Sequence, residues 1–288
     1  MERILVPSDG SPLAEAILPI VVKLARDQDA EVVLLRAEEV QPPPGEEVTS
    51  AEVRALGESR LRALASTLEG HGLKRVRWMV WSAEPVQAIR DAARAQGADL
   101  IAMATHGRGG LSRLLLGSVA AGVVQSVSVP VLLLRGRLSG TTWSLRRLLV
   151  PLSGEVESET ILPVAERLAG PADLGLHLLE VIEPLPAAAE YFPGRDELLA
   201  FRRTEAERYL EKVTERLSAK GIRVTWSVRV GRAPEAIISA AAETGVDLIA
   251  MATHGRGLLG RLLFGSVADA VLRAAPVPVL LLRISESV

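Results

Sequence analysis

The residues best suited to chemistry are a glycine-rich segment that occurs twice and an aspartate near the amino terminus. The segment MATHGRG occupies residues 103–109 and again 251–257, and a Gly-Ser pair follows each copy, Gly117-Ser118 and Gly265-Ser266. Glycines let the backbone approach a ligand closely, and a Gly-Ser pair that opens a helix offers main-chain N–H groups and a hydroxyl to an anion. Arg108 adds positive charge nearby. The pattern predicts a phosphate-binding loop in each half.

The aspartate belongs to the segment Pro7-Ser8-Asp9-Gly10-Ser11, which follows the first apolar run. If the strand order is 3-2-1-4-5, the first and fourth strands flank the point where the order reverses, and open α/β sheets bind ligands there. Asp9 and the glycine loop would then face one crevice, where the carboxylate accepts hydrogen bonds from ribose or adenine. We therefore predict nucleotide binding by the first half. The alternative interpretation is purely structural, because similar loops occur in α/β domains that bind no ligand at them.

The elements that must position these groups also repeat. Residues 130–135 return nearly intact as 278–283, at the same separation as the glycine segments, and residues 4–7 resemble 148–151. Short apolar runs alternate with longer amphipathic stretches, which predicts alternating strands and helices. Strands are expected in the first half near 3–8, 31–39, 74–81, 99–104 and 130–135, and in the second near 146–151, 174–182, 222–229, 247–252 and 278–283. Helices of the first half are expected near 12–27, 50–69, 84–96 and 117–127.

Apolar strands such as residues 100–103 are typical of a parallel sheet that is covered on both faces. We predict an α/β protein with two tandem Rossmann-like open parallel five-stranded sheets that carry helices on both faces. The domains are expected at residues 1–138 and 144–288. Each last strand would be an apolar sheet edge, so we expect the two last strands to pair between the halves as an intramolecular pseudo-dimer. Whether two chains form a homodimer stays open.

Composition narrows the classes of function. The 288 residues carry a net charge of −2 and no cysteine, which argues against a duplex-DNA surface, disulfides and thiolate metal sites. No apolar run approaches the roughly 20 residues of a membrane-spanning helix, and the amino terminus lacks the long apolar region of a signal peptide. We expect a cytoplasmic protein that binds neither nucleic acid nor membrane.

The chain resembles the universal stress protein family. The resemblance rests on the Pro7–Ser11 segment and on the glycine segment, which is separated from its Gly-Ser pair by the nine residues after Gly107. The ATP-binding branch of this family has the pattern G-x2-G-x9-G-[S/T], and the resemblance covers essentially the whole chain, once per half, as in the tandem members. It implies a sheet of order 3-2-1-4-5 in each half and ATP as the ligand, held in an extended loop. The ATP-binding residues that it implies in the first half are Pro7, Ser8, Asp9, Ala37, Met103, Ala104, Gly107, Arg108, Gly117, Ser118 and Val119. Those that it implies in the second half are Pro151, Ser153, Val181, Met251, Ala252, Gly255, Arg256, Gly265, Ser266 and Val267.

Two departures from the family pattern stand out. Alanine replaces its first glycine in both halves, at Ala104 and Ala252, and Ser153 stands where the first half has Asp9. A charged partner strengthens a hydrogen bond to roughly 1.5–3 kcal/mol, whereas a neutral one gives about 1 kcal/mol. We therefore expect the second half to bind ATP more weakly than the first, or not at all.

The leading hypothesis is an ATP-binding regulatory protein of the stress response that does not turn ATP over efficiently. Mg²⁺ could accompany the triphosphate, held mainly by its oxygens. A slow ATPase or phosphotransferase that uses the same pocket is the alternative, and a structural protein with vestigial sites is the third class. No Walker lysine follows the glycines, and no catalytic residue is assigned. His106 and His254 are interpreted as loop side chains rather than general bases.

Overall fold

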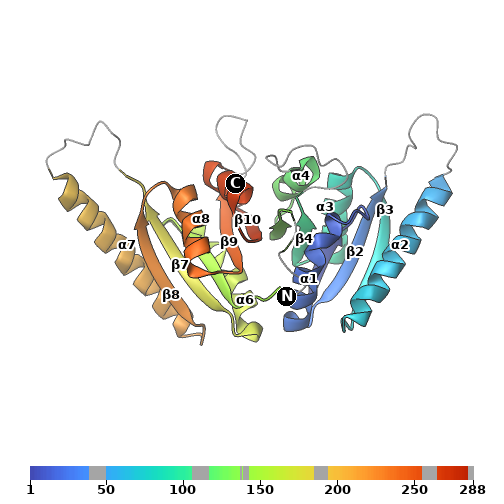
Figure 1. The fold of residues 1–288 in the computed structure, drawn as a ribbon, viewed down its shortest axis with the longest axis horizontal. Helices are drawn as coiled ribbons and strands as arrows, with labels where there is room; N and C mark the ends of the chain where they lie inside the picture. Colours follow the sequence, from blue (N-terminus) through green and yellow to red (C-terminus); the bar gives the residue numbers. More distant parts are fainter. Residues whose placement is uncertain are drawn as a thin grey trace. The chain divides into compact units, whose positions relative to one another are not determined.

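The computed structural model describes residues 1–38, 50–105, 117–136, 138, 143–184, 194–254 and 265–284. The chain divides into two compact units, Met1–Ser144 and Leu145–Val288. Each unit is an open sheet with helices on both of its faces (Figure 1).

The first unit contains five strands that pair in parallel. Its strands are β1 (Arg3–Pro7), β2 (Glu31–Glu38), β3 (Val76–Ser82), β4 (Leu100–Ala104) and β5 (Val131–Leu134). Its helices are η1 (Ala14–Ile17), α1 (Leu18–Gln28), α2 (Ser50–Gly70), α3 (Pro85–Gln96) and α4 (Ser118–Ser126). The strand order is β3-β2-β1-β4-β5, and each neighbouring pair is parallel. The predicted order 3-2-1-4-5 is confirmed.

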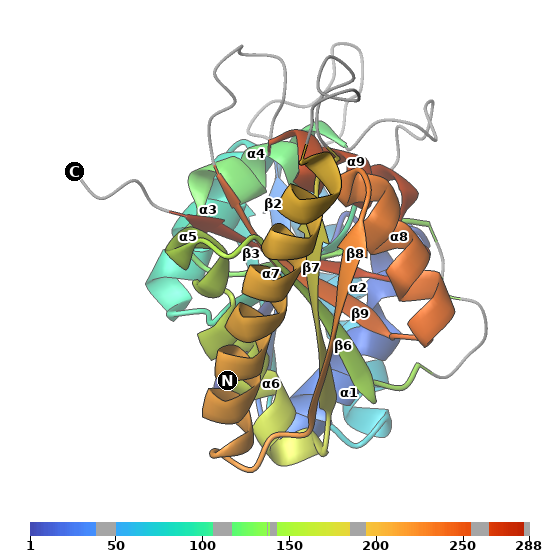
Figure 2. The same ribbon diagram turned by 90° about the vertical axis from the view of Figure 1, so that its left-hand side faces the viewer.

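The second unit repeats this topology. Its strands are β6 (Arg147–Leu152), β7 (Gly175–Ile182), β8 (Val224–Val230), β9 (Leu248–His254) and β10 (Val279–Ile284). Its helices are α5 (Val156–Glu159), α6 (Leu162–Ala172), α7 (Arg195–Ser218), α8 (Ala233–Thr244) and α9 (Ser266–Ala274). The strand order is β8-β7-β6-β9-β10, again with parallel neighbours. Helices α7 and α8 lie on opposite faces of β7 and β8 (Figure 2).

The two halves differ in length at one place. Equivalent residues of the first two strands, such as Pro7 and Pro151, are 144 positions apart in the sequence. Equivalent residues of the later strands, such as Met103 and Met251, are 148 positions apart. The additional residues of the second half therefore lie between β7 and β8, in the segment that contains α7.

Local signals in the sequence explain where several helices begin and end. Pro85 occupies the first turn of α3, and the Glu84 side chain caps that helix by accepting the amides of Val86 and Gln87 at 3.1 and 3.2 Å. The helix ends at Gly97, which adopts a left-handed conformation with φ of 59°. Glycine adopts this conformation without the steric penalty of a Cβ atom, so it ends the helix at that residue.

The central strands form the core of each unit. All residues of β4 are buried, and Ile4 and Leu5 of β1 are fully inaccessible to solvent. Since successive residues of a strand point to opposite faces, burial of both sets requires helices on both sides of the sheet. Polar groups are therefore available mainly at the ends of these strands.

Within the described ranges, no helix combines the length and the hydropathy that crossing a bilayer requires.

Helix α4 packs against α3 at a glycine, and this contact can be tested. A Cβ atom on Gly122 would lie 2.7 Å from Cγ2 of Val86 and 3.1 Å from its Cγ1. We expect Gly122→Ala to lower the free energy of unfolding by about 1–2 kcal/mol, because overpacking outweighs the better helix propensity of alanine. Chemical unfolding of the intact chain measures the effect.

The matched background for this test is Val86→Ala, which removes both obstructing methyl groups. In that background Gly122→Ala should stabilise the chain by about 0.5–1 kcal/mol, the ordinary advantage of alanine over glycine in a helix. The same stabilisation in both backgrounds would contradict the close contact.

Candidate functional site

The segment after β1 is shaped by hydrogen bonds to its own side chains. The Ser8 amide donates to the Leu35 carbonyl of β2 at 2.8 Å, and the Ser8 Oγ accepts the Gly10 amide at 3.1 Å. Asp9 Oδ1 accepts the Ser11 amide at 2.8 Å. Gly10 has a φ of 75°, a left-handed conformation that favours glycine. These side-chain turns hold Asp9 at the carboxyl edge of the sheet.

At the end of β4 the chain leaves the sheet and returns to the same point. The amide of Thr105, which is 2% exposed, donates to the Leu134 carbonyl of β5 at 2.9 Å. The Thr105 carbonyl then accepts the Gly117 amide at 2.8 Å, and α4 begins at Ser118. Within the described part of the chain, no side chain caps the start of α4. Its first N–H groups and the positive end of its dipole are therefore suited to an anion.

These two elements lie at the same edge of adjacent strands. β1 and β4 pair with the register Ile4↔Leu100 and Leu5↔Ile101, and continuing this register brings Asp9 level with Thr105. β2 lies on the other side of β1, and β5 lies on the other side of β4, so the strand order reverses between β1 and β4. The carboxylate and the start of α4 thus flank the point where open α/β sheets bind ligands.

An arginine of the second strand supports the Asp9 loop. Arg36 Nη1 donates to the Asp9 carbonyl at 3.1 Å, and Arg36 Nε lies 3.7 Å from Glu38 Oε1. Helix α2 packs directly onto this pair, because a Cβ atom on Gly57 would lie 2.5 Å from Glu38 Oε1 and 2.9 Å from Arg36 Cδ. The sequence interpretation did not identify this contact, since its partners come from three separate segments.

The predicted residues of the first half that the structure describes lie at or next to this edge. They are Pro7, Ser8, Asp9, Ala37, Met103, Ala104, Gly117, Ser118 and Val119. Ser118 is exposed, whereas Met103 and Ala104 are 6% and 8% exposed and belong to the buried end of β4. The predicted phosphate contacts Gly107 and Arg108 lie outside the described residues, as does His106.

The corresponding edge of the second half has a different first loop. Ser153 follows β6 and is exposed, and its amide donates to Ser158 Oγ at 3.1 Å. Gly154 has a φ of 79°, which matches the conformation of Gly10. The backbone turn is thus retained, while the carboxylate of Asp9 is replaced by a hydroxyl.

A carboxylate takes the place of the supporting arginine. The register of β6 with β7 repeats that of β1 with β2, which makes Glu180 the equivalent of Arg36. A Cβ atom on Gly154 would lie 3.5 Å from Glu180 Oε1, so this side chain lies next to the loop. Its buried Oε2 has no hydrogen-bond partner among the described residues, and burial raises the pKa of Glu180. The second loop is therefore next to an acid rather than a base.

A second acid lies in the first turn of α9. Asp269 is 7% exposed and accepts hydrogen bonds from Arg273 Nε at 2.9 Å and Nη2 at 3.1 Å. Its equivalent in α4 is Ala121. Since negative charge near a helix amino terminus offsets the positive end of the dipole, α9 is less suited than α4 to an added anion.

The predicted residues of the second half that the structure describes also lie near its carboxyl edge. They are Pro151, Ser153, Val181, Met251, Ala252, Gly265, Ser266 and Val267. Gly265 has a φ of 76°, whereas Gly117 has a φ of −58°, so the two helix starts differ in backbone conformation. Gly255 and Arg256 lie outside the described residues.

One buried histidine lies away from these edges. His177 in β7 places Nδ1 2.9 Å from Thr225 Oγ1 and Nε2 3.0 Å from Ser227 Oγ. Burial lowers the pKa of His177, and the positive charges of Arg147 and Arg229 add to the effect. Both hydroxyls come from β8, so this group satisfies the polar atoms of a buried side chain.

The universal stress protein family model matches the chain twice, over residues 1–135 and 144–283. A universal stress protein of Methanocaldococcus jannaschii is 31% identical over 140 residues, which are 46% of this chain and 82% of that protein. One from Mycobacterium tuberculosis is 30% identical over 192 residues, 65% of this chain and 62% of that protein. The chain thus spans less than two thirds of the mycobacterial relative.

Among solved structures, a universal stress protein from Archaeoglobus fulgidus has the same fold. The comparison gives a TM-score of 0.75 with 23% sequence identity and covers 98% of both chains. A functionally unknown protein from Pseudomonas aeruginosa gives a TM-score of 0.69 with 20% identity, over 98% of this chain and 92% of that one.

The unpaired Glu180 oxygen leads to a pH-dependent prediction. Because the folded-state pKa of Glu180 is raised above 4.5, its unfolded-state value, the folded chain loses stability as the pH rises through the folded-state pKa. We expect Glu180→Gln to raise the free energy of unfolding by about 1 kcal/mol at neutral pH, since an amide carries no charge to desolvate. Below pH 4.5 the gain should disappear. Urea unfolding at both pH values measures the difference.

Exposed Glu183 provides the matched control, because Glu183→Gln should change stability little at either pH. A gain from Glu180→Gln of equal size at acidic and neutral pH would show that titration of this carboxyl is not the cause.

Proposed function

We propose that this chain, which belongs to the universal stress protein family, binds ATP at the carboxyl edge of its first half and acts as a regulatory protein of the stress response without efficient turnover. The observation that carries the proposal is the hydrogen bond from the Gly117 amide to the Thr105 carbonyl, 2.8 Å long. This bond fixes the start of α4 next to the loop that carries Asp9, which follows the neighbouring strand β1. One ligand with phosphates and hydroxyl groups can use both.

Each element has a distinct role in this proposal. The first N–H groups of α4 and the hydroxyl of Ser118 bind phosphate oxygens, a role that the family resemblance also gives to Gly107 and Arg108. Asp9 accepts hydrogen bonds from the nucleoside, while Arg36 holds the Asp9 carbonyl and thereby the loop. Mg²⁺ enters with the triphosphate and is held mainly by phosphate oxygens.

The second half is proposed as the weaker ATP site. Ser153 lacks the charge of Asp9, and the partly buried Glu180 stands where the first half has Arg36. Glu180 brings negative charge towards a ligand that is itself strongly negative, which lowers its affinity. Asp269, where the first half has Ala121, is paired with Arg273, so that arginine is engaged within α9.

Calorimetric titration of the intact chain with ATP tests this asymmetry. We expect one strong site per chain and a second that is about tenfold weaker, because a charged acceptor contributes roughly 0.5–2 kcal/mol more than a neutral one. Asp9→Ser, which gives the first loop the serine of the second, should weaken the strong site about tenfold. The matched control is Ser153→Ala, which should leave the strong site unchanged.

Four outcomes test the assignment of Asp9 and decide between the classes of function. Unchanged strong binding in Asp9→Ser would contradict the assignment of Asp9, and absence of ATP binding would favour the structural class. Incubation of the complex with [γ-³²P]ATP tests turnover. Phosphate release or transfer faster than ATP dissociation would favour the ATPase or phosphotransferase alternative, whereas unhydrolysed ATP on the protein supports a regulatory role.

A further inference from the structure

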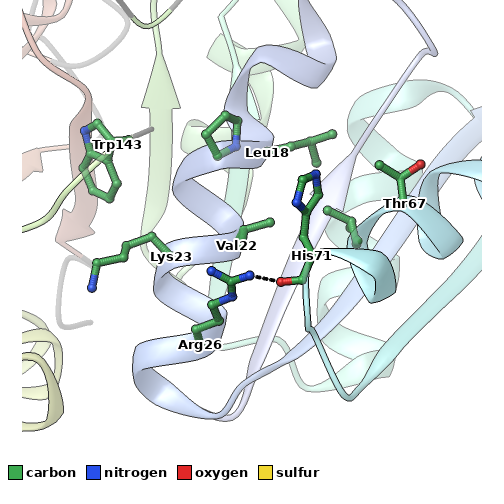
Figure 3. Close-up of a pocket in the computed structure, with 9 residues that line it drawn as sticks. Leu18, Val22, Lys23, Arg26, Thr67, His71 and Trp143 are labelled. Carbon is green, nitrogen blue, oxygen red and sulfur yellow. Dashed lines mark hydrogen bonds between the residues drawn. The ribbon is translucent and has the colours of Figure 1, made fainter. Parts of the chain in front are cut away.

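A groove on the outer surface of α1 lies apart from the predicted nucleotide-binding residues. It has a volume of about 310 Å³ and is formed by α1, the carboxyl end of α2 and Trp143. Trp143 lies on one side of α1, with Thr67 of α2 and His71 of the following turn on the other (Figure 3). None of the predicted ATP-binding residues lines it.

The base of the groove is apolar and incompletely covered. Leu18, Pro19, Val22 and Trp143 are each only partly buried, and the neighbouring Leu68 is 1% exposed. Side chains three or four residues apart on a helix are neighbours, so Leu18 and Pro19 each lie next to Val22, and together they form a patch beside the indole ring. This patch remains in contact with water unless a ligand covers it.

The rim of the groove carries basic groups. Arg26 Nη2 donates to the His71 carbonyl, which fixes the guanidinium between α1 and the turn after α2 (Figure 3). One such bond leaves other N–H donors of the guanidinium available to a second acceptor. Lys23 Nζ lies 2.5 Å from Asp27 Oδ2. Two cations and one carboxylate give this rim a net positive charge.

The second half shows that the groove is not a requirement of the fold. Helices α1 and α6 both end at a left-handed aspartate, Asp29 and Asp173, which makes Glu166 the equivalent of Val22. Helices α2 and α7 both end before a left-handed glycine, Gly72 and Gly221. Alignment on these glycines makes Lys220 the equivalent of His71, and Arg216 the equivalent of Thr67.

Ion pairs occur at the corresponding surface of the second half. Lys220, in the turn after α7, has its Nζ 2.6 Å from Oε2 of Glu166 in α6, and Arg216 Nη2 of α7 lies 2.5 Å from Oε2 of Glu159 in α5. Leu162, the equivalent of the partly exposed Leu18, is only 2% exposed. The same backbone therefore carries charge pairs at this surface in one half and an apolar groove with basic residues in the other.

We propose that the groove of the first half binds a small amphipathic anion, an alkyl or aryl carboxylate. Its apolar body would lie on Val22 and Leu18 beside the indole of Trp143, and its carboxylate would accept hydrogen bonds from Arg26 and Lys23. A guanidinium is well matched to a carboxylate in shape and charge. The volume is near the lower end of the range for ligand sites, which suits a single ring or a short chain.

Trp143 provides a direct readout of binding. Trp78→Phe, Trp81→Phe and Trp226→Phe together leave it as the one tryptophan of the chain. Titration of this variant with octanoate should change the Trp143 emission along a saturable curve, because the alkyl chain replaces water at the indole. The uncharged 1-octanol should bind at least tenfold more weakly if the basic rim contributes a charge-assisted hydrogen bond.

Val22→Glu tests the place of binding by introducing the residue of the second half. It should weaken octanoate binding at least tenfold, because a carboxylate then occupies the apolar surface beside the ligand. The matched control is Glu166→Val, which changes the equivalent position of the second half and should leave octanoate binding unchanged. Circular dichroism and an unchanged ATP affinity would show that Val22→Glu remains folded.

Three results would overturn the proposal. They are a non-saturable response of Trp143 to octanoate, equal binding of octanoate and 1-octanol, and undiminished octanoate binding by folded Val22→Glu. The proposal does not depend on the nucleotide site, so the weaker ATP binding expected of Asp9→Ser should leave the octanoate titration unchanged.

Discussion

The hydrogen bond from the Gly117 amide to the Thr105 carbonyl joins both ends of the segment between β4 and α4 to one point of the sheet. Thr105 is also bonded to β5 and is buried, so this point moves only with the core. Because β4 pairs with β1, the start of α4 is held beside the loop that carries Asp9. The positions of the polar groups at this edge of the sheet are thus set by the strands from which they follow. The phosphate-binding part of the proposed site depends on this attachment.

The two halves share this scaffold and differ in the charges placed on it. The turns at Gly10 and Gly154 have nearly the same backbone conformation, and the registers of the first two strands are the same in both halves. The side chains around the two turns nevertheless differ. Ser153 replaces the carboxylate of Asp9 with a hydroxyl, and Glu180 replaces the basic Arg36 with an acid. Main-chain geometry is set by the packed strands, whereas polar edge residues can be replaced at a smaller cost in stability. A duplicated fold can therefore retain its shape while its halves acquire different affinities.

The outer surfaces of the helices have diverged in the same way. In the second half, Glu166 and Lys220 connect α6 to the turn after α7, while in the first half the equivalent positions belong to an apolar groove with a basic rim. Exposed ion pairs contribute little to stability, so neither arrangement is demanded by folding. The helices are held instead by buried residues such as Leu68 and Leu217, which occupy equivalent positions in α2 and α7. Because folding does not depend on these outer helix surfaces, the surface of one half can acquire a function that the other half lacks.

Local patterns in the sequence were sufficient to predict the tandem repeat, the alternating strands and helices and the helix that begins at Ser118, while the family resemblance implied the sheet order. Those features depend on residues that are close in the chain or on the short list of topologies open to alternating elements. Contacts between distant segments were not predictable in this way. Arg36 on the Asp9 loop, Gly57 against Glu38, the unpaired Glu180 and the groove beside Trp143 each join segments that only folding brings together. Which side chains meet there depends on register and packing across the whole unit, and the tertiary structure alone decides it.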